Sequence, residues 1–216
     1  MNIAPAVEPD PREIVLCLYE PTLDGFAAAW VVRKAFRENF IPVEFSQSKE
    51  GLTYGADGRN ALCFGDLPIG HANGARSAIY FTTKQHALEK PIPFNQWEKV
   101  FPYGVKTFSR GVVAATAYQK RLVDSNVSLC RLAWDFFYPE EGVPLLLSKI
   151  GDHVSGLAGT DAADFYACAD SYPQNFATFD ALVEACEDPK KRDFMLAGGQ
   201  SINRYLKKYG IHNGKI

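Results

Sequence analysis

Residues 14–30 read IVLCLYEPTLDGFAAAW, and this stretch decides the fold. Its first part, Ile14 to Tyr19, is an unbroken apolar run, which is typical of a parallel strand covered on both faces. A short turn follows, and the alanine-rich segment that begins at Asp24 predicts a helix with Asp24 as its N-cap. Ligands of open α/β sheets bind beyond the carboxyl end of such a strand. Taken alone, Asp24 is better explained as a helix cap than as a ligand.

The composition is that of an ordinary globular protein. The chain has 216 residues, of which 47% are hydrophobic and 22% charged, with a formal net charge of -2. This balance predicts no electrostatic footprint for duplex DNA or a membrane surface, although a local groove for nucleotides or short single strands stays compatible with it. The sequence contains no apolar run of membrane-spanning length and no signal-peptide pattern, so we expect a cytoplasmic protein. Its five scattered cysteines predict neither a disulfide framework nor a zinc site.

Further apolar runs continue the pattern along the first half of the chain. The predicted helix extends to about Asn39, and short strands are predicted at 41–45, 61–64 and 78–81. A strand, a helix and a second strand make a unit whose crossover is right-handed by default. The fold class that follows is α/β, with a doubly wound, mainly parallel sheet.

The second half of the chain is predicted to be helical. The expected helices lie at 112–122, 129–137, 144–150, 162–169, 179–186 and 190–209. The paired Gly198 and Gly199 predict a close helix contact, because glycine inside a helix otherwise costs stability. We divide the chain into a lead-in at 1–12, an α/β domain at 13–160 and a helical C-terminal extension at 161–216.

Three aspartates follow apolar segments: Asp24, Asp66 and Asp152. If their strands are parallel neighbours, Asp24 and Asp66 reach the same edge of the sheet. Converging carboxylates of this kind hold Mg²⁺ or Mn²⁺, which can polarise a phosphoryl oxygen and activate a water. Aspartate is also common at strand ends for turn and capping reasons, and each residue singly fits that explanation better.

Residues 19–30 resemble the first motif of the DHH (Asp-His-His) phosphoesterase superfamily, in a compact bacterial and phage-type branch whose motif has a histidine, four residues, Asp-Gly-Phe and then Ala-Ala-Trp. The resemblance continues in order over nearly the whole chain. The segments that carry it are Cys63-Phe64-Gly65-Asp66, Ile79 to Lys84, Leu132 to Phe137, Asp170 to Pro173, and Phe176 with Phe179-Asp180. Ser109 to Val112 competes for the position given to Leu132 to Phe137. The resemblance implies metal ligation by Asp24, Asp66 and Asp152.

Several positions depart from the family pattern. Tyr19 stands at the motif-one histidine, and Phe81-Thr82-Thr83 stands at Asp-His-His. Phenylalanine has no lone pair and threonine hydroxyls are weak ligands, so a bridging carboxylate and three imidazoles are missing. Glu20 or His86 could substitute for a lost ligand.

Two further residues could contact a phosphate, namely Lys84 and His153, although an exposed lysine needs no such role and His153 is better explained as a solvated loop histidine. Larger members of the family add a C-terminal domain with a Gly-Gly-Gly-His type motif. The chain has only Gly198-Gly199-Gln200 in the corresponding region, so we expect no complete second domain of that type.

The sequence therefore predicts a catalytically degenerate DHH-phosphoesterase-like protein that acts by binding a protein partner, a nucleotide or a second copy of itself. No cofactor is expected. The alternative is a metal-dependent phosphodiesterase or nuclease with a reduced Mn²⁺ or Mg²⁺ site, which hydrolyses nucleotides or short oligonucleotides. Tyr172, Trp97, Phe101 and Tyr103 are candidate contact anchors or simply cover the core. The branch resembled implies a bacterial cytoplasm, or that of the host if the protein is phage-encoded.

Overall fold

The computed structural model describes residues 13–49, 52, 54–56, 58–65, 67, 72–82, 112–115, 119–123, 127–157 and 161–210; for 72, 73, 77, 82, 112–115 and 119–123 the description covers the backbone. Its strands are β1 (Val15–Tyr19), β2 (Val43–Gln47), β3 (Tyr54–Gly55), β4 (Asn60–Phe64), β5 (Ala72–Asn73), β6 (Ser77–Thr82), β7 (Val112–Ala115) and β8 (Gln119–Val123). Its helices are α1 (Leu23–Glu38), α2 (Leu129–Phe137), α3 (Leu145–Val154), α4 (Ala162–Asp170), α5 (Phe176–Glu187) and α6 (Pro189–Lys208).

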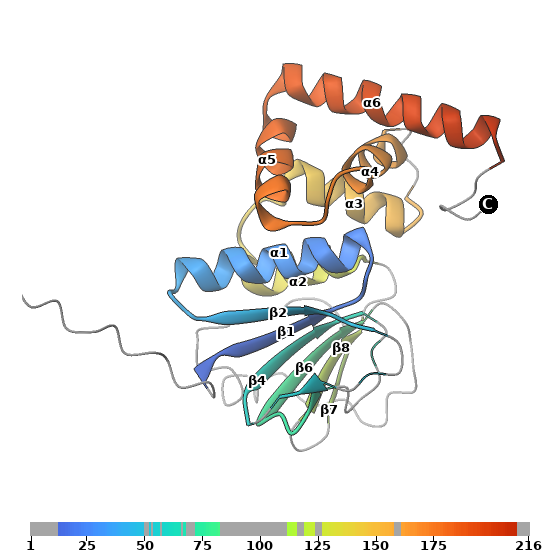
Figure 1. The fold of residues 1–216 in the computed structure, drawn as a ribbon. Helices are drawn as coiled ribbons and strands as arrows, with labels where there is room; N and C mark the ends of the chain where they lie inside the picture. The colour runs from blue at the N-terminus through green and yellow to red at the C-terminus, as the bar shows by residue number, and fades with distance from the viewer. Residues whose placement is uncertain are drawn as a thin grey trace, which may run out of the picture.

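A six-stranded sheet in the order β2-β1-β4-β6-β8-β7 forms the base of the molecule (Figure 1). β2, β1, β4, β6 and β8 are parallel, and β7 pairs with β8 in the antiparallel direction. After β1 the chain first builds β2 on one side and later builds β4 on the other. The strand order therefore reverses between β1 and β4, and this is the position where open α/β sheets bind ligands.

Both faces of the central strands are buried, as the sequence predicts. Val15 and Cys17 of β1 belong to the core that α1 and α2 cover, whereas Leu16 and Leu18 belong to a second core on the opposite face. Tyr54 of β3 and Ala75 pack against that second core. The prediction of an α/β protein with a mainly parallel sheet is confirmed. Double winding is not, because the helices within the described ranges all lie on one side of the sheet (Figure 1).

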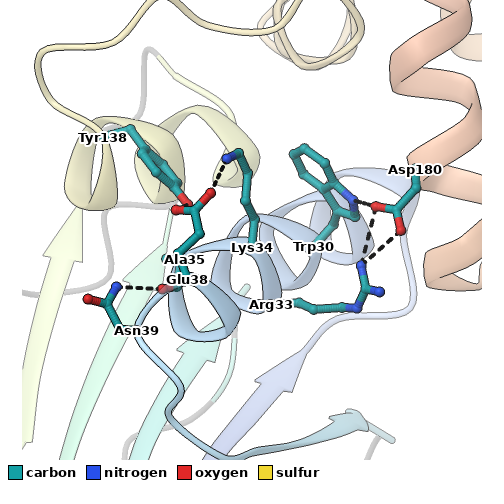
Figure 2. A network of polar contacts seen from close by, with 8 residues as sticks. All are labelled: Trp30, Arg33, Lys34, Ala35, Glu38, Asn39, Tyr138 and Asp180. Atoms are coloured by element: carbon teal, nitrogen blue, oxygen red, sulfur yellow. Dashed lines mark hydrogen bonds and ion pairs between the residues drawn. The ribbon is translucent and has the colours of Figure 1, made fainter.

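Helices α3–α6 form a further layer, on the side of α1 and α2 away from the sheet (Figure 1). Phe26 of α1 stacks on Phe176 of α5 with ring centroids 5.2 Å apart, and Trp30 packs against Phe179. Figure 2 shows how Asp180 adds polar contacts to this junction. It accepts hydrogen bonds from the Trp30 indole at 2.7 Å and from the Arg33 guanidinium at 3.1 Å.

The other end of α1 is tied to α2 in the same view (Figure 2). The Tyr138 hydroxyl, just past α2, donates to the Glu38 carboxylate at 2.6 Å, and Lys34 forms an ion pair with that carboxylate. The Asn39 amide donates to the Ala35 carbonyl at 2.7 Å and closes the C-terminus of α1. Side-chain contacts thus connect α1 to both α5 and α2.

Close packing of α4 against α6 explains the glycine pair of α6. A Cβ at Gly199 would lie 1.8 Å from the Asp164 carbonyl oxygen of α4, whereas a Cβ at Gly198 would meet only the Cys168 sulfur, at 3.7 Å. The predicted close helix contact is therefore confirmed, and Gly199 is the residue that requires it.

The predicted helix at 112–122 is wrong. Val112–Ala115 form β7 and Gln119–Val123 form β8, an antiparallel pair that extends the sheet beside β6. Helical periodicity in a short apolar segment does not distinguish a helix from a strand, and pairing with an existing sheet edge overrides it. Within the described part of the chain, no helix is both long and apolar enough to cross a membrane.

Candidate functional site at the reversal point of the sheet

Glu20 lies at the reversal point, directly beyond β1. Its backbone N–H donates to the Phe64 carbonyl at 3.0 Å and so extends the pairing of β1 with β4. Gly65 follows β4 with a φ of 123°, and a Cβ there would lie 2.5 Å from a Glu20 carboxylate oxygen. Glycine at 65 therefore allows both the backbone turn and the passage of the Glu20 side chain. Asp66, the next residue, lies outside the described residues.

The turn between β1 and α1 is closed by Thr22, which is the N-cap of α1. The Thr22 hydroxyl accepts from the Gly25 N–H at 3.0 Å and donates to Glu20 Oε1 at 3.1 Å. A Cβ at Gly25 would lie 2.4 Å from the Glu20 carbonyl oxygen, so the turn folds tightly against the helix. The prediction that Asp24 caps α1 is therefore wrong, because Thr22 already fills that position one residue before the helix begins.

Asp24 instead reaches the N-terminus of α2. Its carboxylate accepts from the Leu129 N–H at 2.8 Å and from the Cys130 N–H at 2.9 Å, and the residue is 4% exposed. Two of the N–H groups that the first turn of α2 leaves unpaired are thereby satisfied, and the positive end of the helix dipole faces the acidic group. Ser128, the N-cap of α2, accepts from a third, that of Arg131.

Burial has the largest effect on the acidity of Asp24. It raises the pKa of this carboxyl above its usual range, and the hydrogen bonds from Cys130 and Leu129 offset part of that effect. Burial, followed by the neighbouring Asp24 charge, also raises the pKa of the Cys130 thiol well above its ordinary value. Cys130 is therefore a neutral thiol at neutral pH and has no character of a nucleophile or thiolate ligand.

Asp152 and His153 lie in the last turns of α3, near the same end of α2. A Cβ at the preceding Gly151 would lie 2.9 Å from the Ser128 hydroxyl, so α3 packs directly on the cap of α2. The Asp152 side chain is partly exposed. The His153 ring packs against Tyr166 of α4 with centroids 4.3 Å apart, and partial burial lowers its pKa.

Tyr166 is a residue that the sequence analysis did not identify. Burial raises its pKa to about 12, and the negative charges of Asp170, Asp24 and Glu20 contribute in the same direction. The phenol is therefore neutral at physiological pH and can donate a hydrogen bond. Only the docking of α4 places it here, and the local sequence of α4 carries no signal of it.

The motif positions lie largely in the core. Phe81 is fully buried and stacks on Phe64 with ring centroids 4.4 Å apart, and Tyr19 packs edge-on against Phe26 at 5.9 Å. Thr82 is the last residue of β6. The remaining candidates lie outside the described residues, namely Thr83, Lys84, His86, Trp97, Phe101 and Tyr103. Among the side chains that are described, no three His, Cys, Asp or Glu residues form a group that could hold a metal ion.

Comparison with known proteins assigns no family. No protein-family model matches the sequence, and no curated protein matches it. A crystal structure of an uncharacterized protein from Helicobacter pylori G27 is similar over 89% of this chain, with 11% sequence identity and a TM-score of 0.39. The aligned part covers 58% of that chain. A similarity of this size carries no argument about fold or function.

Proposed function

We propose that this protein is a catalytically silent, DHH-phosphoesterase-like protein that acts by binding. The observation that carries the proposal is the position of Asp24, the first aspartate of the motif. Both of its oxygens accept backbone N–H groups of α2, and the side chain is almost completely buried. A carboxylate held in this way has a structural role, because the N-terminus of α2 fixes its position.

The environment of Phe81 supports the same proposal. In the family that the sequence resembles, this position carries a metal-binding carboxylate, whereas here it carries a ring of β6 that stacks on Phe64 of β4. Phe136 of α2 packs on the same ring, with centroids 5.2 Å apart. The side chain contributes to packing between the sheet and α2, and an aromatic ring at this position offers no oxygen to a metal.

Thermal unfolding with and without Mn²⁺ tests the proposal. We expect the melting temperature of the wild-type chain to stay unchanged at millimolar Mn²⁺, because a protein that binds an ion only in its folded state is stabilised by that ion. Asp66→Ala is the matched variant. A Mn²⁺-dependent rise in melting temperature that Asp66→Ala abolishes would contradict the silent-protein proposal.

The alternative function is a metal-dependent phosphodiesterase with a reduced site on Asp24, Asp66 and Asp152. Glu20 at the reversal point supports it, because its carboxylate lies against Gly65 at the carboxyl end of β4 and its negative charge acts on the neutral Tyr166 phenol. A carboxylate and a proton donor at this edge suit phosphoryl chemistry. Hydrolysis of bis(p-nitrophenyl) phosphate with Mn²⁺, lost in both Glu20→Gln and Asp66→Ala, would establish this function over the first.

A further inference from the structure

A second candidate site lies between α5 and α6, far from the sheet. It is a groove of about 430 Å³, within the size range of protein ligand sites. Leu182 and Met195 are 7% and 6% exposed and form its floor. Ala181 and Ala185 lie one turn apart on α5 and line one wall, where their small side chains leave the hollow open.

Large apolar side chains at the groove face water. Phe194 of α6 is 79% exposed, and Tyr172, just before α5, is 45% exposed. Leaving an aromatic ring in water beside an apolar hollow costs free energy that a bound partner would recover. Tyr172 is thus at a surface, as expected of a contact anchor.

The rim of the groove is positively charged. Lys190 and Lys191 lie in the first turn of α6, where the helix dipole adds to their charge. Their backbone N–H groups bond to Asp188, but neither ammonium has an ion-pair partner among the described residues. α6 carries six basic residues and one acidic residue, although the chain as a whole has a net charge of -2. The charge of this helix is therefore opposite in sign to that of the rest of the molecule.

We propose that this groove binds an amphipathic helix of a partner protein, whose apolar residues fill the hollow and whose acidic residues face Lys190 and Lys191. Side chains at i, i+3 and i+4 of a helix lie on one face and can enter a short apolar groove together. The floor and one wall of the hollow consist of aliphatic side chains and Met195, which the apolar face of such a helix can fill. The inference is independent of the proposed function, because none of these residues belongs to the reversal point of the sheet.

A pair of synthetic peptides tests the proposal. The acidic peptide is a fluorescein-labelled helix of about 18 residues, with leucines at i, i+3, i+4 and i+7 and glutamates on both sides of this apolar stripe. The basic control peptide has lysines in place of the glutamates. Fluorescence anisotropy with the full chain measures binding. We expect saturable binding of the acidic peptide and binding of the basic peptide that is at least about tenfold weaker.

Three variants locate the binding. Ala181→Arg fills the hollow from an exposed position, and Lys190→Glu with Lys191→Glu reverses the charge of the rim. We expect each change to weaken binding of the acidic peptide by about tenfold or more. Lys207→Glu with Lys208→Glu makes the same charge change at the far end of α6, and we expect this variant to keep the wild-type affinity for the acidic peptide. Circular dichroism melts establish that all variants are folded.

Several outcomes overturn the proposal. The first is equal binding of the two peptides, and the second is no binding of the acidic peptide at about 100 µM. A loss in the Lys207/Lys208 variant as large as that in the Lys190/Lys191 variant is the third. Binding of oligo(dT) or of phosphatidylserine vesicles that depends on Lys190 and Lys191, without peptide binding, would assign the groove to another class of partner. Self-association in light scattering that Ala181→Arg abolishes would assign it to a second copy of the chain.

Discussion

The reversal point of the sheet and the α5–α6 groove differ in whether their side chains have partners within the chain. At the reversal point, the acids are engaged with backbone and hydroxyl groups of the chain itself: Asp24 with α2, and Glu20 with Thr22. At the groove, Phe194 faces water and two lysines lack acidic partners within the described residues. Groups engaged internally stabilise a fold, whereas groups left without partners are available to other molecules. We therefore propose that binding occurs at the helical end and that the acids at the sheet edge have a structural role.

Asp24→Ala is the most direct way to break this comparison. It leaves the buried N–H groups of Leu129 and Cys130 without acceptors, and each such group costs about 1–3 kcal/mol. We expect the free energy of unfolding to fall by about 3 kcal/mol, as measured by urea denaturation. Asp152→Ala is the matched control, because its side chain is partly exposed and makes no hydrogen bond or ion pair with the described residues; we expect less than about 0.5 kcal/mol there. Equal losses in the two variants would show that Asp24 is not specially structural.

Gly199→Ala tests the helical layer by steric means. An added methyl group would overlap the Asp164 carbonyl of α4, and overpacking of this kind costs about 1–3 kcal/mol. Gly198→Ala adds the same group where only the Cys168 sulfur is near, at 3.7 Å. For Gly198→Ala we expect the free energy of unfolding to rise by up to about 1 kcal/mol, because alanine has a higher helix propensity than glycine. Thermal melts of the two variants should therefore shift in opposite directions, and a loss in both would contradict the assigned contact.

The pH dependence of stability sharpens the role of Asp24. Burial raises the pKa of this carboxyl in the folded protein, so the folded state holds its proton at pH values where the unfolded chain has released it. The contribution of Asp24 is then largest below the ordinary aspartate pKa of about 3.9 and declines as pH rises through the folded-state pKa. The asparagine of the Asp24→Asn variant does not titrate, so this variant serves as the reference. We expect the unfolding free energy of the wild type, minus that of Asp24→Asn, to fall as the pH rises from about 4. A difference that grows with pH would mean that the helix N–H groups outweigh burial.

Phe194→Ser is expected to have the smallest effect on stability. The ring is 79% exposed, and exposed substitutions change the unfolding free energy by no more than about 0.5 kcal/mol. The same change removes an apolar wall of the groove, so binding of the acidic peptide should weaken while the urea midpoint stays fixed. A large loss of stability would show that Phe194 serves the fold and would weaken the contrast between the two regions.

Prediction from sequence succeeded where a short continuous segment carries the apolar pattern of a buried strand or helix. The strands at 14–19, 61–64 and 78–81 are apolar runs buried on both faces, and the helix at 129–137 is found with those bounds. The segment 112–122 failed because its structure depends on pairing with β6, which local periodicity does not report. The β7–β8 edge of the sheet is thus determined by tertiary contacts.

Sequence reasoning predicted where the candidate site lies, but not the hydrogen-bond partners of its side chains. Sequence reasoning brought Asp24 to the carboxyl edge of the sheet, and the chain indeed turns there. It did not find that Thr22 caps α1 or that the Asp24 carboxylate bonds to residues more than a hundred positions later. The role of Tyr166 likewise depends on how α4 packs. Such partners are chosen by the assembled structure, so a single sequence read along its length does not reveal them.

The bond between Asp24 and the start of α2 has a consequence for synthesis on the ribosome. The strand–turn–helix unit around Asp24 emerges long before Leu129 and Cys130 are translated, and for that interval its acid has no helix terminus to bind. Domains fold as units during translation once their necessary contacts are available. A nascent chain, or a truncated product ending before residue 129, would therefore carry an aspartate in an apolar setting without its donors. Such chains should stay protease-sensitive until α2 arrives to complete the first layer.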